Sequence, residues 1–260
     1  MRILAIVRRV PDSRAALKVR GDGSGIETAG LKYVCDPFDE FGVEQAVRLK
    51  EQRSDVEEIV ALGIGGEEVS EALRHALAMG ADRAARVATS GGDGPRHDEV
   101  ALARLLAEGV TTLGPFDLIL CGKQSIDNDA GELGPALAEF LGLPDVGAVT
   151  NLELSVDGRV LALRRRIEGA EEVVELPLPG VVTCEKGLVE PRHPPLPKIM
   201  KVKKAPIDLV AAEATGLAAS TRFVRLTPPP GRPACRFLEG DTADMARELV
   251  RVLREEARVI

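Results

Sequence analysis

The sequence is poor in the residues that nucleic-acid-binding proteins and many enzymes use most. It contains no tryptophan, one tyrosine, six phenylalanines and three histidines among 260 residues. The low aromatic content and the net charge of −7, with acidic and basic residues interspersed, argue against a surface that stacks bases or follows a phosphate backbone. We therefore expect no nucleic acid as partner, but a protein or a small molecule.

Cysteines and long apolar runs are also few. The four cysteines, Cys35, Cys121, Cys184 and Cys235, are far apart and form no CxxC pair, so neither a zinc knuckle nor a disulfide framework is predicted. No stretch approaches the ~18 apolar residues that a membrane helix needs. The apolar run Ile3 to Val7 is too short for the h-region of a signal peptide. We expect a cytoplasmic protein without direct membrane insertion.

Residues suited to catalysis or metal binding are sparse. His75 lies in a helical pattern and His193 in a proline-rich segment, so a nucleophile activated by histidine is not expected. Asp127, Asp129 and Glu132 could hold a metal, but acids in such loops more often cap helices or face solvent. We predict no catalytic residue and no metal site.

What the chain does have is a regular alternation of short β-branched runs with helical patterns. Four strands are predicted in the first half: Ile3 to Val7, Glu58 to Leu62, Ala84 to Val87 and Leu118 to Cys121. Helical periodicity follows in segments that begin near Asp39, Glu67, Asp98 and Gly131. This order is typical of βαβ units and predicts an α/β fold with a doubly wound, mostly parallel, Rossmann-like sheet.

The second half has a different texture. Asp157-Gly158 lies between two alternating runs and predicts a hairpin, hence an antiparallel extension of the sheet. Val181 to Cys184 is predicted as one more buried strand. Residues 187–206 are so rich in proline and lysine that we expect a loop without regular structure and with an exposed apolar centre. One α/β domain is predicted over residues 1–225, including this loop.

The tail, residues 226–260, is predicted to be a separate linker and helix. The segment LTPPPGRP indicates a linker, and Asp241 is a candidate N-cap for a final helix. Met245, Leu249, Val252 and Leu253 fall on one side of that helix. An apolar side must be buried, so the tail packs either on its own body or on a partner chain.

Three polar loops follow the carboxyl ends of predicted strands: RRVPDS, GIGGEE and GKQSIDND. In open parallel sheets, ligands bind where such loops converge at a switch in strand order. Gly63, Gly65 and Gly66 permit close approach of the backbone, and the next helix could offer free N–H groups to an anion. Neither the dinucleotide fingerprint nor a Walker loop is present, and tight βα turns alone would explain any single loop. The three loops together favour a nucleotide, with an adenine nucleotide preferred.

Four longer segments point to a family. CDPFDEFGVEQAVRLKE, ALAMGADRA, LCGKQSIDND and EPRHPPLPKIMKVKK resemble, in order and spacing, the small (beta) subunit of electron transfer flavoproteins. The resemblance covers residues 1 to about 206 closely and the tail loosely. It implies an electron carrier subunit that is not an enzyme by itself. It also implies a heterodimer in which a large alpha subunit holds most of the FAD, while the small subunit binds AMP structurally and its tail packs on the alpha subunit.

The same resemblance implies positions for the sites. The cofactor-binding positions carry over to Ile6, Asp36, Pro37, Phe38, Asp39, Ile64, Gly122, Lys123, Gln124, Ser125, Ile126, Asp127, Asn128, Asp129, Ala130, Gly131, Glu132 and Leu133. The partner-recognition positions carry over to Leu196, Pro197, Ile199 and Met200. Phe38 matches an aromatic residue that approaches the flavin, and Leu196 matches an apolar anchor. The chain departs from the family at Asp36, where asparagine is usual, and at Ser13, where many relatives have an aromatic residue.

The resemblance also implies the direction of electron flow. Flavoprotein dehydrogenases such as acyl-CoA dehydrogenases would deliver electrons, and a membrane quinone oxidoreductase would receive them. Two other interpretations stay open. One is an electron-bifurcating form that holds a second FAD in place of AMP and oxidises NADH, against which the bulk of Phe38 argues. The other is a stand-alone adenine-nucleotide-binding protein of the stress type, which predicts a stable homodimer.

Overall fold

A single sheet organises the computed structural model, which describes residues 1–88, 98–212, 221–232 and 234–260. Its strand order is β11-β5-β4-β1-β6-β10-β7-β8-β9. The strands are β1 (Arg2–Ile6), β4 (Glu58–Gly65), β5 (Arg83–Ala88), β6 (Leu118–Gly122), β7 (Asp145–Leu154), β8 (Val160–Ile167), β9 (Ala170–Pro177), β10 (Gly180–Cys184) and β11 (Asp208–Ala211). All neighbours from β11 to β7 are parallel, and β7, β8 and β9 are antiparallel.

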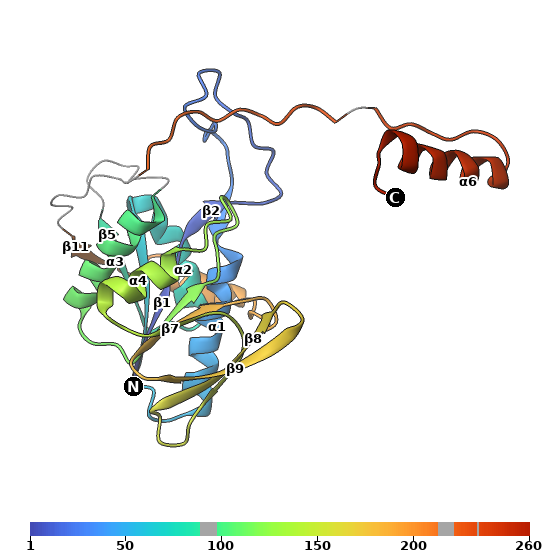
Figure 1. Ribbon diagram of the computed structural model, residues 1–260. Coiled ribbons are helices and arrows are strands. Elements are labelled where there is room, and N and C mark those ends of the chain that lie inside the picture. Colours follow the sequence, from blue (N-terminus) through green and yellow to red (C-terminus); the bar gives the residue numbers. More distant parts are fainter. Residues whose placement is uncertain (89–97, 213–220, 233) are drawn as a thin grey trace.

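Helices cover both faces of the parallel part (Figure 1). Successive side chains of a strand point to opposite faces, and β1 shows the result. Ile3 joins the core under α1 (Pro37–Gln52) and α2 (Ser70–Met79), whereas Leu4 joins the core under α3 (Glu99–Leu113) and α4 (Leu133–Leu141). The predicted doubly wound α/β class is confirmed.

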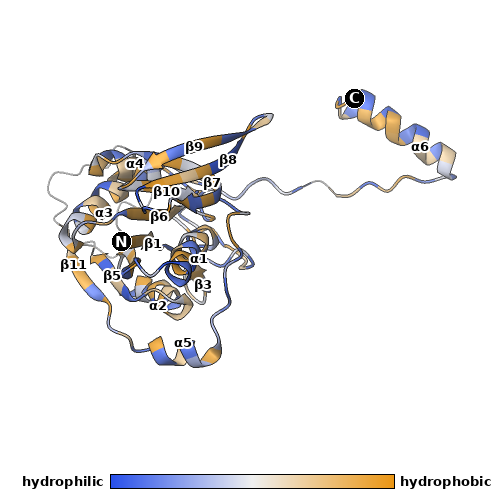
Figure 2. Cartoon of the chain, turned by 90° about the horizontal axis from the view of Figure 1, so that it is seen from below, coloured by the Kyte–Doolittle hydropathy of each residue, from blue (hydrophilic) through white to orange (hydrophobic). Residues whose placement is uncertain are grey.

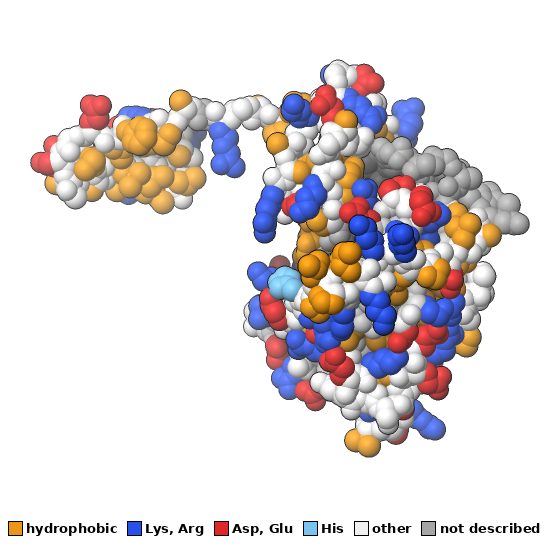
Figure 3. Space-filling view, turned by 180° about the vertical axis from the view of Figure 1, so that it is seen from behind, with side chains coloured by type: hydrophobic (Ala, Val, Ile, Leu, Met, Phe, Trp, Pro, Cys, Tyr) orange, Lys and Arg blue, Asp and Glu red, His pale blue; other side chains and the backbone are white. Residues whose placement is uncertain are grey.

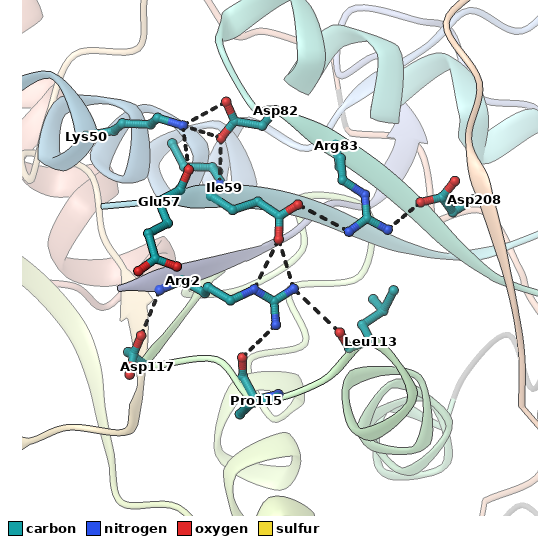
Figure 4. Close-up of polar contacts among 11 residues, drawn as sticks. Arg2, Lys50, Glu57, Ile59, Asp82, Arg83, Leu113, Pro115, Asp117 and Asp208 are labelled. Carbon is teal, nitrogen blue, oxygen red and sulfur yellow. Dashed lines mark hydrogen bonds and ion pairs between the residues drawn. The ribbon is translucent and has the colours of Figure 1, made fainter. Parts of the chain in front are cut away.

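Charged residues at the amino ends of five adjacent strands form a ladder that follows the strand order (Figure 4). Asp208 on β11 binds Arg83 on β5 at 2.6 Å, and Arg83 binds Glu58 on β4 at 3.2 Å. Glu58 in turn binds Arg2 on β1 at 2.8 Å, and the carboxylate of Asp117, just before β6, accepts from the Arg2 backbone N–H at 2.7 Å. We call this set the amino-edge ladder. Negative and positive side chains alternate from one strand to the next, so each charge lies beside an opposite charge on the neighbouring strand.

Several element boundaries differ from the sequence-based prediction. Helix α1 begins at Pro37, two residues early, because Asp36 caps it by accepting from the Phe38 N–H at 2.9 Å, and proline fits the first turn. Strand β4 runs to Gly65, so Ile64 lies in the strand rather than in a loop. The glycine at 63 is required by packing, since a Cβ there would lie 2.7 Å from Cγ1 of Val69.

The hairpin at Asp157-Gly158 is confirmed, with the Gly158 N–H donating to the Ser155 carbonyl at 2.9 Å. Strand β9 then adds a further antiparallel partner that the sequence pattern did not reveal. A small two-stranded sheet was also missed, made of β2 (Arg9–Pro11) and β3 (Tyr33–Cys35). Three-residue strands carry too few alternating positions to be seen as a pattern.

The prediction that residues 187–206 lack regular structure is wrong. Helix α5 (Leu196–Val202) forms there, with Pro195 as N-cap and Pro197 in the first turn, where a missing N–H costs nothing. The approach to α5 is fixed to α1, because the Arg192 guanidinium binds Glu44 at 2.7 Å and Glu51 at 2.6 Å. None of the residues of α5 is buried, so the expected apolar exposure is confirmed.

The C-terminal arm extends away from the body and ends in α6 (Thr242–Arg251), followed by the wide turn Val252–Glu256 (Figure 1). Asp241 is the N-cap, as predicted, and accepts from the Asp244 N–H at 2.8 Å. Hydrophobic side chains gather on one side of this helix, and no residue of α6 is buried (Figure 3). The predicted linker includes Pro233, which lies outside the described residues. Among the residues described, no helix has both the length and the apolar character to cross a membrane.

Candidate nucleotide site at the strand switch

The order of the strands reverses between β1 and β6. From β1 the chain builds outward through β4 and β5 and then crosses back to β6 on the other side of β1, where β10 and β7 also lie. The loops that leave the carboxyl ends of β1 and β6 therefore diverge, which is where α/β proteins of this type bind ligands. We call this place the switch site. It is built from the segment after β1, the first turn of α1, the first turn of α3 and the β6–α4 loop, residues 123–132.

A buried ion pair joins three of these elements. The guanidinium of Arg8 binds Asp39 through two bonds, Nε to Oδ2 at 3.0 Å and Nη2 to Oδ1 at 2.9 Å, and the Arg8 backbone N–H adds a third at 2.8 Å. The Asp39 side chain is fully buried, and that of Arg8 is 11 % exposed. Burial alone lowers the pKa of Arg8, but the charge and hydrogen bonds of Asp39 outweigh it, and the pKa is raised. Arg8 therefore stays charged.

Asp39 also fixes the end of β6. Its Oδ1 accepts from the Gly122 N–H at 3.0 Å, while Arg8 Nη2 donates to the Gln124 carbonyl at 3.0 Å. A Cβ at position 122 would lie 2.5 Å from Asp39 Oδ1 and 2.8 Å from the carbonyl carbon of Phe38. Only glycine therefore lets the first turn of α1 approach the β6–α4 loop this closely.

Asp36 holds the next part of the loop. Its Oδ2 accepts from the Ser125 hydroxyl at 2.9 Å and from the Ile126 N–H at 3.1 Å, while Oδ1 caps α1. Burial raises the pKa of Asp36 to about 6, with a further contribution from the charge of Asp39. Both carboxylate oxygens of Asp36 accept hydrogen bonds from the chain itself, so the residue holds the β6–α4 loop against the first turn of α1.

The β6–α4 loop closes on itself above these two acids. The Ser125 N–H donates to the Ala130 carbonyl at 3.0 Å, and the Asp129 N–H donates to the Ser125 carbonyl at 2.9 Å. Asp129 has a φ of +57°, and the Asn128 side chain accepts from the Ala130 N–H at 2.9 Å. Such Asx turns order a short polar loop without helix or strand. The side chains of residues 127, 128 and 129 are left at the surface.

Two polar atoms at the switch site are buried without a hydrogen-bond partner among the described residues: Nη1 of Arg8 and Oε2 of Glu99. Glu99 begins α3, and its other oxygen accepts from the Asn128 side chain at 3.2 Å. Burial raises the pKa of Glu99, whereas the charge of Arg8 lowers it, so the two groups act on one another. Buried polar atoms are rarely left unpaired. A cationic donor beside an acceptor fits a nucleotide, which offers phosphate oxygens to Arg8 and hydroxyl or amino hydrogens to Glu99.

The structure brings most of the predicted cofactor positions together, but they differ in burial and in the contacts that they make. Ile6 and Leu133 are buried in the core under α3 and α4, and Ile64 packs against that core. Phe38 is half-buried and packs edge to face on Phe41, with 6.1 Å between ring centroids. Lys123 forms an ion pair with Glu185, the residue that follows β10, the strand beside β6.

Sequence reasoning missed Arg8 and Glu99. Arg8 is the first polar residue after an apolar strand, and Glu99 follows an N-cap aspartate at the start of a helix. The sequence positions of both residues could have marked them as candidates. That each keeps an unpaired buried atom could not be predicted, because it depends on which partners Asp39 and Asn128 bind in the folded chain.

The predicted partner-recognition residues lie together on α5, which packs beside α2 at the rim of the body (Figure 2). Leu196, Ile199 and Met200 are spaced i, i+3, i+4 and share one face of the helix. Their exposed fractions are 70 %, 42 % and 59 %. Three adjacent large apolar side chains at such exposure are typical of a protein-binding surface.

The fold defines an α/β protein with a doubly wound, Rossmann-like sheet and two apolar surfaces, on α5 and on α6, that the described part of the chain leaves uncovered. Comparison with known proteins gives its family. Residues 24–215 match the model of the electron transfer flavoprotein domain. The chain is 38 % identical to the electron transfer flavoprotein subunit beta of Bradyrhizobium diazoefficiens and 34 % identical to that of Bacillus subtilis, in both cases over all of each chain. It is 36 % identical to the human subunit over all of this chain and 99 % of the human one. The chain belongs to the electron transfer flavoprotein family, on the beta-subunit side.

Proposed function

We propose that this chain is the small subunit of a heterodimeric electron carrier. The observation that carries the proposal is the full-length similarity to beta subunits, 34 to 38 % identical for the two bacterial ones. A large alpha subunit would hold most of an FAD, which supplies the redox chemistry when bound. Electrons would come from flavoprotein dehydrogenases such as acyl-CoA dehydrogenases and leave to a membrane quinone oxidoreductase.

In this proposal the switch site holds AMP as a structural ligand. Arg8 Nη1 would donate to the phosphate, and Glu99 Oε2 would accept from the nucleoside. The first turn of α1 and the β6–α4 loop would surround the nucleotide, with Asp36 and Asp39 keeping both in place. Support comes from the two unpaired buried atoms and from the position of the site at the strand switch.

In this proposal the apolar surfaces of α6 and α5 each bind one protein partner. The apolar side of α6 includes Leu249, which is 47 % exposed, and would pack on the alpha subunit. Leu196 on α5 would enter an apolar pocket of a dehydrogenase. Because Arg192 fixes the approach to α5 on α1 and α5 itself packs beside α2, the anchor is presented in one orientation before the encounter, which lowers the entropy lost on docking. Phe38 would lie beside the flavin.

The test is to co-express the chain with the large subunit, purify the complex, release its nucleotides by heat and quantify them by chromatography. We expect one FAD and one AMP per heterodimer. Two FAD and no AMP would replace the proposal by the bifurcating form, which oxidises NADH. A stable homodimer that does not copurify with a large subunit would favour the stand-alone nucleotide-binding protein instead.

A further inference from the structure

A cavity lies at the opposite end of the parallel strands from the switch site, between the α2–β5 turn and the segment that joins α5 to β11. Its volume is about 550 Å³. This is within the range of roughly 300–1,000 Å³ that is usual for small-molecule sites. Leu77 and Ala81 form one wall, and Val202, Ala205 and Pro206 form the other. One wall therefore belongs to the rigid body and the other to α5 and its continuation.

The cavity carries an excess of positive charge. Two of its lining residues are acids, but Asp82 is bound to Lys50 at 2.7 Å and Asp208 to Arg83 at 2.6 Å (Figure 4). Lys198 and Lys201 also line the cavity, and neither forms an ion pair within the described part of the chain. They are spaced i, i+3 on α5, so both ammonium groups reach the same side of the helix. A ligand with an anionic group would meet two cations that have no ion-pair partner among the described residues, the charge of Lys198 also acting on Glu51 at longer range.

The remaining lining indicates the body of that ligand. The walls are aliphatic, and among the described residues none that lines the cavity is aromatic, so a purine or another flat ring has no stacking partner there. The backbone N–H groups of the α2–β5 turn are already used, since Gly80 and Ala81 donate to the Ala76 carbonyl and Asp82 donates to Ile59. A nucleotide would thus find neither a stacking partner nor backbone donors on that side. An aliphatic chain fits better.

We propose that this cavity binds a small aliphatic carboxylate, with the carboxylate held by Lys198 and Lys201 and the chain lying between Leu77 and Pro206. Because α5 forms one wall, the bound molecule contacts the helix that carries Leu196, Ile199 and Met200. If α5 docks dehydrogenases, a step that rests on the proposed function, the occupied cavity changes how fast they reduce the carrier.

The experiment is a calorimetric titration of the purified heterodimer with sodium octanoate. We expect one site per heterodimer, no saturable binding of acetate, and at least about tenfold weaker binding of 1-octanol, which keeps the chain and lacks the charge. The variant Lys198→Ala/Lys201→Ala should weaken octanoate binding by at least about tenfold. The matched control is Lys203→Ala/Lys204→Ala, which removes two cations of the same segment that do not line the cavity, and it should bind octanoate like the wild type.

Equal losses in the two double variants would overturn the proposal, because they would show general attraction to a basic segment. Equal affinity for octanol and octanoate would also overturn it, because the lysines would then not bind the carboxylate. A second variant, Ala205→Phe, fills the cavity without changing charge and should abolish binding; retained binding would place the ligand elsewhere. Calorimetry reads the site without any electron donor. A failure of α5 to dock dehydrogenases would appear only in the reduction rate, with octanoate binding unchanged.

Discussion

The two edges of the sheet use the same charged residues in different ways. At the amino edge, Asp208, Arg83, Glu58, Arg2 and Asp117 form a ladder in which every charge has a partner. At the carboxyl edge, Arg8 and Asp39 form a buried pair, yet Nη1 of Arg8 has no hydrogen-bond partner in the described part of the chain. The side chains of the ladder are between about a fifth and a half exposed, whereas Asp39 is fully buried.

We infer from this difference that the charges at the amino edge stabilise the sheet, whereas those at the carboxyl edge bind a ligand. Exposed charges that satisfy one another contribute little free energy, but they favour one strand order over others. Buried charges are costly unless fully paired, so an unpaired buried donor indicates a place where a ligand completes the set. The predictions below test this contrast, from the largest expected effect on stability to the smallest.

The largest loss of stability is expected for Asp39→Ala. It leaves the buried Arg8 guanidinium without its counter-charge and removes the acceptor of the Gly122 N–H. Breaking a buried pair from one side costs about 3–5 kcal/mol. Urea unfolding of the variant and the wild type measures this value. The control is Asp55→Ala, which breaks an exposed pair with Arg53 and should cost no more than about 1 kcal/mol.

The second effect depends on pH and isolates Asp36. Its pKa is about 6 in the folded chain, above the ordinary value of 3.8, so the folded state binds the proton more tightly than the unfolded state. The contribution of Asp36 to stability is therefore fully present below about pH 4 and is lost as pH rises through 6. The loss amounts to at most about 3 kcal/mol.

Asp36→Asn should remove this contribution. The free energy of unfolding, measured by urea between pH 4 and 7 for both proteins, should fall more steeply with rising pH in the wild type than in the variant. All other titrating groups are shared, so the difference between the two curves reports on position 36. Parallel curves would show that Asp36 does not take up a proton in this range.

Glu58→Gln breaks two bonds of the amino-edge ladder, to Arg2 and to Arg83. Because these side chains are reached by solvent, we expect a loss of only about 1 kcal/mol in urea unfolding. The neighbouring Glu57→Gln, at a side chain that is 75 % exposed, should cost nothing measurable. A loss for Glu58→Gln as large as that for Asp39→Ala would mean that burial does not decide between the two edges.

Leu196→Ala should leave stability within about 0.5 kcal/mol of the wild type, because the side chain is 70 % exposed. It should slow reduction of the heterodimer by a dehydrogenase at least about tenfold, since apolar anchors dominate such interfaces. Stopped-flow reduction measures the rate, and flavin content should be unchanged. Leu209→Ala, an equally exposed leucine on β11, is the matched control. Loss of flavin in Leu196→Ala would refute the anchor role.

The sequence was sufficient for the parts of the fold that repeat. Strands such as Leu118–Gly122 are buried on both faces and appear as unbroken apolar runs, and the helices between them have regular apolar spacing. Short elements were not predictable in this way. Helix α5 has only seven residues and packs beside α2, which is distant in sequence, and β2 pairs with β3, more than twenty residues away.

The site was predictable as a set of loops but not as a set of contacts. The sequence pattern placed residues 122–129 beside the loops that follow the first two strands, and only the resemblance to the family added residues 36–39. It gave no means to tell that Asp36 and Asp39 face inward, where they hold Ser125 and Gly122. Nor could it identify Arg8 and Glu99 as the groups with spare hydrogen-bonding capacity.

The central claim is that a nucleotide occupies the carboxyl edge and not the amino edge. Hydrogen–deuterium exchange of the nucleotide-stripped heterodimer, with and without AMP, tests it directly. We predict slower exchange on adding AMP in residues 6–8 and 122–133, and no change at the amino-edge ladder, in residues 81–84 and 113–118. Protection at the ladder, or no protection in the β6–α4 loop at saturating AMP, would contradict the account.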